Sequence, residues 1–187
     1  MARITAGIAT SHVPAIGGAI HKGLKQDPYW KPFFDGFPPV QEWLAETAQR
    51  HGLWLVAGSI PLAASSPDKM RNSSLVFNPA GECVDRYDKV HLFGFKKGDE
   101  AYDEAAFIEP GSQLVAVDTP FGRIALSICY DLRFPELYRA LAPVDLILVP
   151  AAFTETTGRA HWEILLRARA IENQCYLLAV GQGGRHE

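Results

Sequence analysis

The spacing of apolar residues predicts an α/β protein from residue 43 onward. Apolar side chains recur every three or four positions in three segments, which is the period of a helix with one buried face. These segments are 43–51, 134–141 and 158–173. Short apolar runs between turn residues predict strands at 53–60, 74–77, 83–87, 113–118, 123–128, 144–149 and 176–180. Helices that alternate with strands in this way indicate layers of helix packed on sheet.

Glycine and proline mark the ends of these elements. Gly52 follows the first helix and is a typical helix terminator. The sequences at 78–81 (Asn-Pro-Ala-Gly) and 119–122 (Thr-Pro-Phe-Gly) are turn sequences, so each is expected to join two strands in a hairpin. Pro150 is expected to end the strand at 144–149.

The first 42 residues follow a different pattern. Glycine and proline recur throughout, and the aromatic pairs at 29–30 and 33–34 need a surface to pack on. The segment is therefore expected to be rich in loops. We divide the chain into this loop-rich segment, 1–42, and an α/β domain, 43–187.

Composition narrows the functional class. The chain has 187 residues, a net charge of −3 and no basic block, so nothing favours nucleic acid as a partner. No apolar run is long enough to cross a membrane, and the N-terminus lacks the apolar core of a signal peptide. The three widely spaced cysteines favour the reducing cytoplasm over a disulfide framework. None belongs to a Cys-x-x-Cys pair, so a zinc site is not expected.

Cys129 is the first candidate for chemistry. It ends the apolar run at 123–128, and the helix expected at 134–141 follows closely. A thiol at the positive end of a helix lies near backbone N–H groups, which favour the thiolate and can bind a developing oxyanion. The same position suits a buried cysteine that only fills space, which is the commoner case. These residues alone leave both interpretations open.

Other polar residues are equally ambiguous by themselves. Lys89 is either a solvated lysine at a strand end or a cation directed at an oxyanion, and in an extended backbone Asp88 projects to the opposite side. Glu104 and Glu109 are expected to be solvated, as most carboxylate side chains are. His161 is expected to be a surface or capping residue, because no second histidine or cysteine lies four positions away. Arg167, Arg169 and Glu172 are expected to form ordinary ion pairs on a helix face.

Taken together, four motifs resemble the nitrilase (carbon–nitrogen hydrolase) superfamily. They are 87–93 (Tyr-Asp-Lys-Val-His-Leu-Phe), Glu104 with 109–111 (Glu-Pro-Gly), 127–136 (Ser-Ile-Cys-Tyr-Asp-Leu-Arg-Phe-Pro-Glu) and 167–173 (Arg-Ala-Arg-Ala-Ile-Glu-Asn). The resemblance begins near residue 40 and continues to the last residue. The cysteine motif is most similar to the amidase-like branch that acts on small ω-amides and deaminated glutathione.

The resemblance implies a fold and a set of roles. The family fold is an α-β-β-α sandwich whose subunits pair through helices, so a partial sandwich and a homo-oligomer are expected. Cys129 matches the nucleophile, and Lys89 matches the group that stabilises the tetrahedral intermediate, together with the backbone N–H of Tyr130. Glu104 matches a supporting glutamate. Tyr130 and Phe153 are expected to contact the substrate, and neither a metal nor another cofactor is implied.

The N-terminal segment departs from the family. The family's general-base glutamate belongs before residue 43, yet no glutamate precedes Glu42. Residues 1–37, including Ser-His-Val-Pro at 11–14, instead resemble the start of the β subunit of protocatechuate 4,5-dioxygenase. In that family the histidine that matches His12 is an iron ligand. The chain is therefore expected to be a fusion whose hydrolase domain is truncated at both ends.

Three functional hypotheses remain. The leading one is hydrolysis of a non-peptide carbon–nitrogen bond in a small amide through a cysteine thioester, impaired by the missing general base. The second is a fragment of an iron-dependent extradiol dioxygenase, which rests on residues 1–37. The third is an inactive α/β remnant that only binds or oligomerises.

Overall fold

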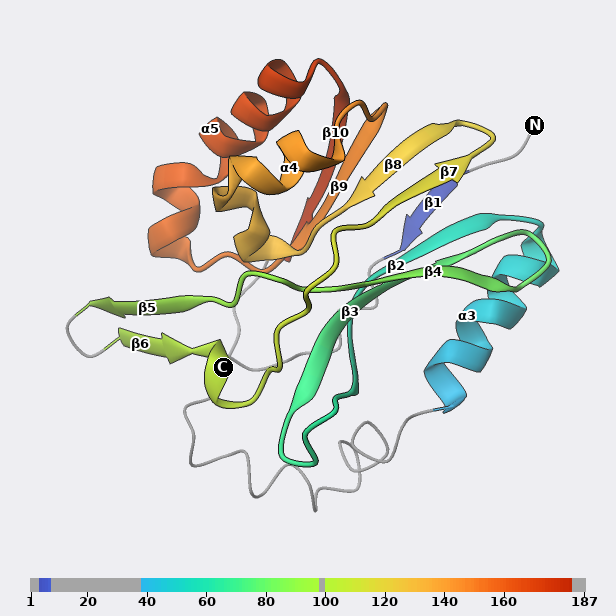
Figure 1. Cartoon of the computed structure of the whole chain (residues 1–187), viewed down its shortest axis with the longest axis horizontal. Coiled ribbons are helices and arrows are strands. Elements are labelled where there is room, and N and C mark those ends of the chain that lie inside the picture. The colour runs from blue at the N-terminus through green and yellow to red at the C-terminus, as the bar shows by residue number, and fades with distance from the viewer. Residues whose placement is uncertain (1–3, 8–37, 98–99, 183–187) are drawn as a thin grey trace. The chain divides into compact units, whose positions relative to one another are not determined.

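The computed structural model describes residues 4–7, 38–97 and 100–182 (Figure 1). The chain forms two compact units, Met1–Ser112 and Gln113–Glu187, and each contains its own four-stranded sheet. The predicted assignment of 1–42 as a separate segment falls largely outside the described residues and stays a prediction.

The sheet of the first unit has the order β1-β2-β3-β4. Its strands are β1 (Ile4–Gly7), β2 (Trp54–Ala63), β3 (Met70–Phe77) and β4 (Cys83–Asp88). β1 pairs in parallel with β2, and the other neighbours are antiparallel. The hairpin predicted around 78–81 is present as the β3–β4 connection.

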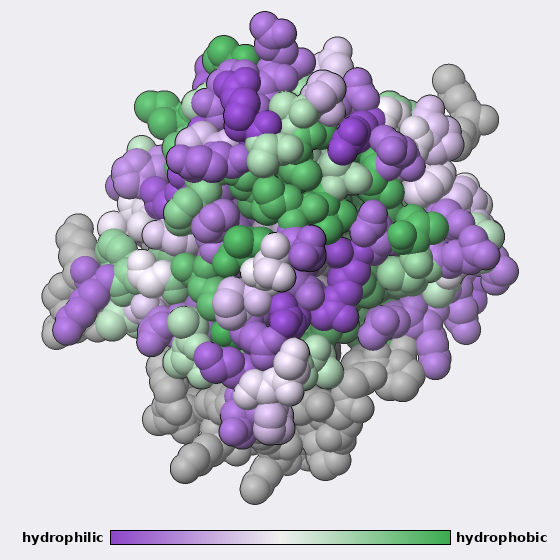
Figure 2. Space-filling view, in the orientation of Figure 1, coloured by the Kyte–Doolittle hydropathy of each residue, from purple (hydrophilic) through white to green (hydrophobic). Residues whose placement is uncertain are grey.

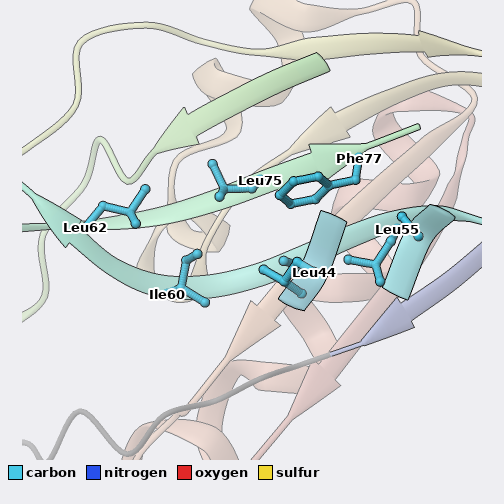
Figure 3. Close-up of a cluster of buried hydrophobic side chains, with 8 residues drawn as sticks. Leu44, Leu55, Ile60, Leu62, Leu75 and Phe77 are labelled. Atoms are coloured by element: carbon cyan, nitrogen blue, oxygen red, sulfur yellow. The ribbon is translucent and has the colours of Figure 1, made fainter. Parts of the chain in front are cut away.

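Helix α3 (Pro38–His51) packs on β2 and β3. Leu44 and Ala48, one helical turn apart, are buried against apolar side chains of the two strands (Figure 3). The strand residues of this cluster are Leu55, Ala57, Ile60, Leu62, Leu75 and Phe77. The helix begins before the predicted residue 43, because proline is compatible with a first helical turn. It ends as predicted at Gly52, whose φ of +59° suits glycine.

A second hairpin in this unit was not predicted. β5 (Gly94–Lys97) pairs antiparallel with β6 (Glu100–Asp103), and a single 3₁₀ turn, η1 (Glu104–Ala106), follows. The strands have four residues each, which is too short for a clear alternation of apolar and polar positions. They are joined by the rings of Phe93, Phe95 and Tyr102, whose centroids lie 5.6–6.5 Å apart.

The sheet of the second unit has the order β10-β9-β8-β7. β7 (Ala116–Thr119) and β8 (Gly122–Leu126) form the predicted hairpin. β9 (Leu146–Ala151) and β10 (Tyr176–Gly181) continue the sheet. β8, β9 and β10 are parallel, so their carboxyl ends lie at one edge of the sheet. Ligands in α/β proteins commonly bind outside such an edge.

Pro150 does not end its strand, so that prediction was wrong. It lies inside β9 and pairs in register with Val180 of β10. The Leu148 carbonyl accepts a hydrogen bond from Ser127, so position 148, and by strand alternation position 150, face β8. The β8–β9 ladder ends at Leu148, so position 150 has no partner on β8 that would need its N–H. Proline is therefore tolerated at position 150.

Three helical segments accompany this sheet: η2 (Cys129–Arg133), α4 (Pro135–Leu141) and α5 (Glu155–Asn173). The helix predicted at 134–141 is present as α4, and the 3₁₀ helix η2 lies between it and the end of β8. The side chain of Thr154, and not His161, caps α5 by accepting the N–H of Thr157.

Most of the surface in view is hydrophilic, with apolar side chains interspersed over α5 (Figure 2). Ile164 and Ile171, seven positions apart on α5, are 69% and 75% exposed. Among the described residues, no helix combines the length and apolar character that a membrane span requires.

Candidate active site

In the first unit, Lys89 is buried and paired with Glu104. Lys89 directly follows β4, and its side chain is 2% exposed. Its Nζ donates a hydrogen bond to Oε2 of Glu104, which begins η1 and is 14% exposed. A lysine is seldom buried unless its charge is paired. The interpretation of these two residues as ordinary solvated charges is therefore wrong.

The Glu104 carboxylate is held by more than the lysine. The backbone N–H of Phe93 donates to Oε2 at 2.6 Å, and the Asn72 side-chain amide approaches Oε1 at 3.5 Å. The Ser59 hydroxyl in turn donates to Asn72 Oδ1 at 2.9 Å. Ser59 has a φ of +46° and lies where the β2–β3 register shifts, so a bulge directs it at Asn72. These contacts fix the carboxylate that meets Lys89.

Neighbouring charges are neutralised separately from this pair. Asp88 accepts hydrogen bonds from the Ser73 hydroxyl at 2.6 Å and from Arg86 Nε at 2.7 Å. Arg71 Nη1 lies 3.7 Å from Asp88 Oδ2. The prediction that Asp88 need not neutralise Lys89 agrees with these contacts.

Glu109 is also an ion-pair partner and not a solvated carboxylate. Arg71 Nη2 donates to its Oε1, and the backbone N–H of Ser66 donates to its Oε2 at 3.0 Å. The Ser66 hydrogen bond is the main reason that the pKa of the Glu109 carboxyl is lowered, with a further contribution from Arg71.

Gly111 allows the chain to pass close to the lysine. Its N–H donates to the Lys89 carbonyl at 2.8 Å. A Cβ at this position would lie 2.1 Å from the Asp88 carbonyl oxygen, so no larger residue fits without backbone movement. The close approach to Asp88 therefore explains why the third residue of the Glu-Pro-Gly motif is glycine.

In the second unit, Cys129 lies just beyond the end of β8 and is partly buried. Its φ is +52°, in the left-handed region that residues other than glycine seldom adopt. Its Sγ lies 3.9 Å from the carbonyl oxygen of Ala152, which directly follows β9. Strained backbone of this kind clusters at active sites. The thiol is therefore only partly buried in a strained turn, and its role as a nucleophile stays a prediction.

Hydrogen bonds on both sides stabilise this turn. The N–H of Ile128 donates to Oδ2 of the fully buried Asp131 at 2.8 Å. The Ser127 hydroxyl donates to the Leu148 carbonyl at 2.8 Å and accepts from the Tyr138 hydroxyl at 3.1 Å. Burial raises the pKa of Tyr138, so its hydroxyl remains a hydrogen-bond donor over the range in which proteins are folded.

Arg133 brings the two predicted substrate-contacting residues together. Its guanidinium carbon lies 5.6 Å from the ring centroid of Tyr130 and 5.5 Å from that of Phe153. Its Nη1 lies 3.1 Å from Nδ1 of His161, which must accept because arginine can only donate. Trp162 packs on Phe153 with a centroid separation of 4.8 Å.

Within each unit, the structure shows which of the predicted site residues contact one another, and their catalytic roles stay predictions. It joins Lys89 to Glu104 in one unit, and it gathers Tyr130 and Phe153 around Arg133 in the other. Sequence reasoning did not single out four residues that contact them or their neighbours: Ser59, Asn72, Asp131 and Arg133. Asp131 and Arg133 lie within the cysteine motif, which was the available signal, whereas Ser59 and Asn72 carry no signal in the sequence.

The remaining carboxylates and candidate metal ligands complete the description of the site. Glu42 and Glu46 are exposed on α3. His12, the residue of the dioxygenase resemblance, lies outside the described residues. Within 4–7, 38–97 and 100–182, no group of three His, Cys, Asp or Glu side chains is arranged to hold a metal ion.

Comparison with known proteins identifies the family. The carbon–nitrogen hydrolase model matches residues 24–187. The chain belongs to the carbon–nitrogen hydrolase family. The match begins before the residue near 40 from which we expected the resemblance. It includes part of the segment that we likened to a dioxygenase, and that likeness stays a prediction.

Relatives agree with this assignment. The chain is 50% identical over 153 residues to the deaminated glutathione amidase of Yersinia enterocolitica, covering 79% of this chain and 54% of that protein. The crystal structure of the Caenorhabditis elegans NitFhit protein aligns with a TM-score of 0.72 and 38% identity, over 90% of this chain and 39% of that one. The predicted α/β fold of the carbon–nitrogen hydrolase type is therefore confirmed.

A second similar structure is a variant of the amidase from Nesterenkonia sp. AN1, with a TM-score of 0.64 and 31% identity. The alignment covers 76% of this chain and 52% of that one. That protein carries an acetamide moiety covalently added at its active-site cysteine. This chain spans about half the length of the curated relatives that it matches.

Proposed function

We propose that this chain hydrolyses the carbon–nitrogen bond of a small amide, such as an ω-amide, through a thioester on Cys129. The observation that carries the proposal is the left-handed backbone of Cys129 at the carboxyl ends of parallel strands. Family membership and the covalent adduct on the cysteine of the Nesterenkonia amidase support the same role.

The proposed reaction has two halves. The sulfur of Cys129 attacks the amide carbon, the carbonyl oxygen becomes an oxyanion, and the thiol proton passes to the leaving nitrogen. The carbon–nitrogen bond then breaks, so that ammonia leaves and a thioester remains. Water adds to the thioester, the carbon–sulfur bond breaks, and the acid and the thiol are released.

We propose that Lys89 and Glu104 act in stabilising the oxyanion and do not transfer the proton. The family resemblance assigns the oxyanion to the ammonium of Lys89 and to the backbone N–H of Tyr130. Within its own unit, Lys89 is buried and paired with Glu104. Glu104 holds the lysine side chain in one orientation through its own fixed carboxylate. Loss of one oxyanion donor typically lowers the rate by about 10²–10³-fold.

We propose that turnover is slow, because residues 1–41, where the resemblance places the family's general base, contain no glutamate. General-base catalysis contributes typically about 10²–10⁴-fold, so the deficit should be measurable. A slow enzyme can still accumulate the thioester if acylation outpaces hydrolysis. Intact-mass detection of an acyl adduct is therefore a more sensitive assay than product release.

The test compares the parent protein with Cys129→Ala and with Cys83→Ala, whose thiol is exposed on β4. We expect ammonia release from a small ω-amide and an acyl adduct in the parent and in C83A. Both signals should disappear in C129A. Persistence of ammonia release in C129A would refute the proposal, and absence of both signals in the parent would favour the inactive remnant.

The setting of the reaction is also a proposal. The thiols of Cys83, Cys129 and Cys175 favour the reducing cytoplasm. The exposed Ile164 and Ile171 on α5 favour association between copies of the chain. Light scattering over a wide concentration range tests this, and a strictly monomeric species at every concentration would contradict it. The dioxygenase alternative rests only on the sequence of residues 1–37.

A further inference from the structure

We infer that Arg169 is a positioning residue for Cys129, because it holds from α5 the turn on which the thiol lies. The inference deepens the proposed function, since it matters to catalysis only if Cys129 is the nucleophile. Sequence reasoning treated Arg169 as one member of an ordinary ion pair on a helix face. Its surroundings are different from those of its neighbour Arg167.

Arg169 is buried, whereas Arg167 is exposed. The side chain of Arg169 is 6% exposed, against 72% for Arg167, which pairs with Glu163 at the surface. A buried arginine requires partners for its charge and its donors. Arg169 Nη1 pairs with Glu172 Oε1 at 2.9 Å on the same helix, which balances the charge. Its Nε remains available for a partner outside α5.

That partner belongs to the cysteine turn. Arg169 Nε donates to the carbonyl oxygen of Leu132 at 3.0 Å. Leu132 is fully buried in η2, the five-residue 3₁₀ helix that begins at Cys129. The last carbonyls of so short a helix lack partners within it, so they need a donor from elsewhere. Arg169 supplies this donor from a residue distant in the sequence.

The same guanidinium also contacts the residue that supports the other end of the turn. Its carbon lies 5.8 Å from the ring centroid of Tyr138, whose hydroxyl donates to Ser127. Arg169 therefore stabilises the chain after Cys129 directly, and the chain before it through Tyr138. A left-handed residue persists only where its surroundings over-determine the backbone. Arg169 thus contacts both flanks from outside the turn, in addition to the link that Asp131 makes from within it.

The test uses Arg169→Met, which preserves most of the aliphatic bulk and removes every donor. Arg167→Met is the matched control, because it removes an exposed ion pair two positions away. In R169M we expect faster hydrogen exchange of the backbone amides of 128–134, by at least about tenfold. We normalise kcat to the fraction of molecules whose Cys129 can be alkylated. In R169M we expect this kcat to fall by about 10²-fold while KM stays within about twofold of the parent value, because small misplacements of reacting groups have such effects.

Arg169→Lys provides a second variant in case R169M does not fold. Lysine retains the positive charge but has a compact ammonium in place of the planar guanidinium. We therefore expect kcat and exchange protection in R169K to lie between those of R169M and the parent. Unchanged exchange of 128–134 in the folded variants, with only a lower melting temperature, would overturn the inference. If exchange depends on Arg169 but the parent hydrolyses no amide, the positioning role holds and the proposed function fails. If the parent is active and R169M retains its kcat, the positioning role alone fails.

Discussion

The ammonium of Lys89 and the carboxylate of Glu104 form a buried hydrogen-bonded ion pair between the end of β4 and the 3₁₀ turn η1. The two residues are fifteen positions apart, and an unpredicted hairpin, β5–β6, lies between them. Because the lysine is almost inaccessible, its charge depends on the Glu104 carboxylate, its ion-pair partner among the described residues. The pair is therefore a structural element as well as a proposed catalytic one.

Removal of one member of this pair should destabilise the protein. We expect Lys89→Met to lower the free energy of unfolding by about 3 kcal/mol, because it leaves the Glu104 carboxylate without its cation. The double variant K89M/E104Q should recover part of this loss, since no uncompensated charge remains. Urea denaturation of the single and double variants measures the coupling. A K89M variant as stable as the parent would show that the pair is not structurally important.

Gly111 should not tolerate a side chain. We expect Gly111→Ala to lower the free energy of unfolding by about 1–3 kcal/mol, because its Cβ would overlap the Asp88 carbonyl. Gly94→Ala is the matched control, since nothing lies within 4 Å of the Cβ added there. Denaturation of both variants checks this, and equal stabilities would argue against a close approach at Gly111.

Stability should decline in acid partly through Glu109. Its pKa is lowered in the folded state, mainly by the Ser66 N–H, so the unfolded chain binds the proton more readily. The stabilisation is therefore complete above the ordinary carboxyl pKa and is lost as the pH falls through the lowered value. We expect Glu109→Gln to reduce the loss of stability between about pH 5 and pH 3.

The control for this measurement is Glu155→Gln, because Glu155 is an exposed carboxylate at the start of α5. It should leave the acid dependence of the denaturation midpoint close to that of the parent. An E109Q variant whose midpoint falls as steeply as the parent's would contradict the assignment.

Cys129 should be alkylated before the other two thiols. Partial desolvation raises the pKa of the Cys83 thiol, although the residue is largely exposed. Desolvation and nearby Asp145 raise the pKa of Cys175, so both thiols are mostly protonated near neutral pH. We expect iodoacetamide at pH 7.5 to label Cys129 first, with Cys83 and Cys175 reacting appreciably only as the pH rises toward 9. Peptide mass spectrometry measures the three rates. Equal rates at neutral pH would argue against an activated Cys129.

Local patterns in the sequence were sufficient for most elements. The apolar period of α3, its end at Gly52 and the two hairpin turns all depend on neighbouring residues, so they could be recognised without a fold. The short strands β5 and β6 could not, because four residues are too few to show a period. Pro150 was misjudged because its effect depends on where the adjacent strand ends.

The sequence by itself determined which segments are apolar, where the turns lie and which motifs place a cysteine, a lysine and a glutamate in the order of the family. Only the tertiary structure decided that Lys89 is buried against Glu104, that Cys129 adopts a left-handed backbone and that Arg169 reaches Leu132. The physical reason is that helix and strand periods arise from neighbouring residues. A hydrogen bond between residues 37 positions apart depends on how strands and helices pack, which no local pattern records.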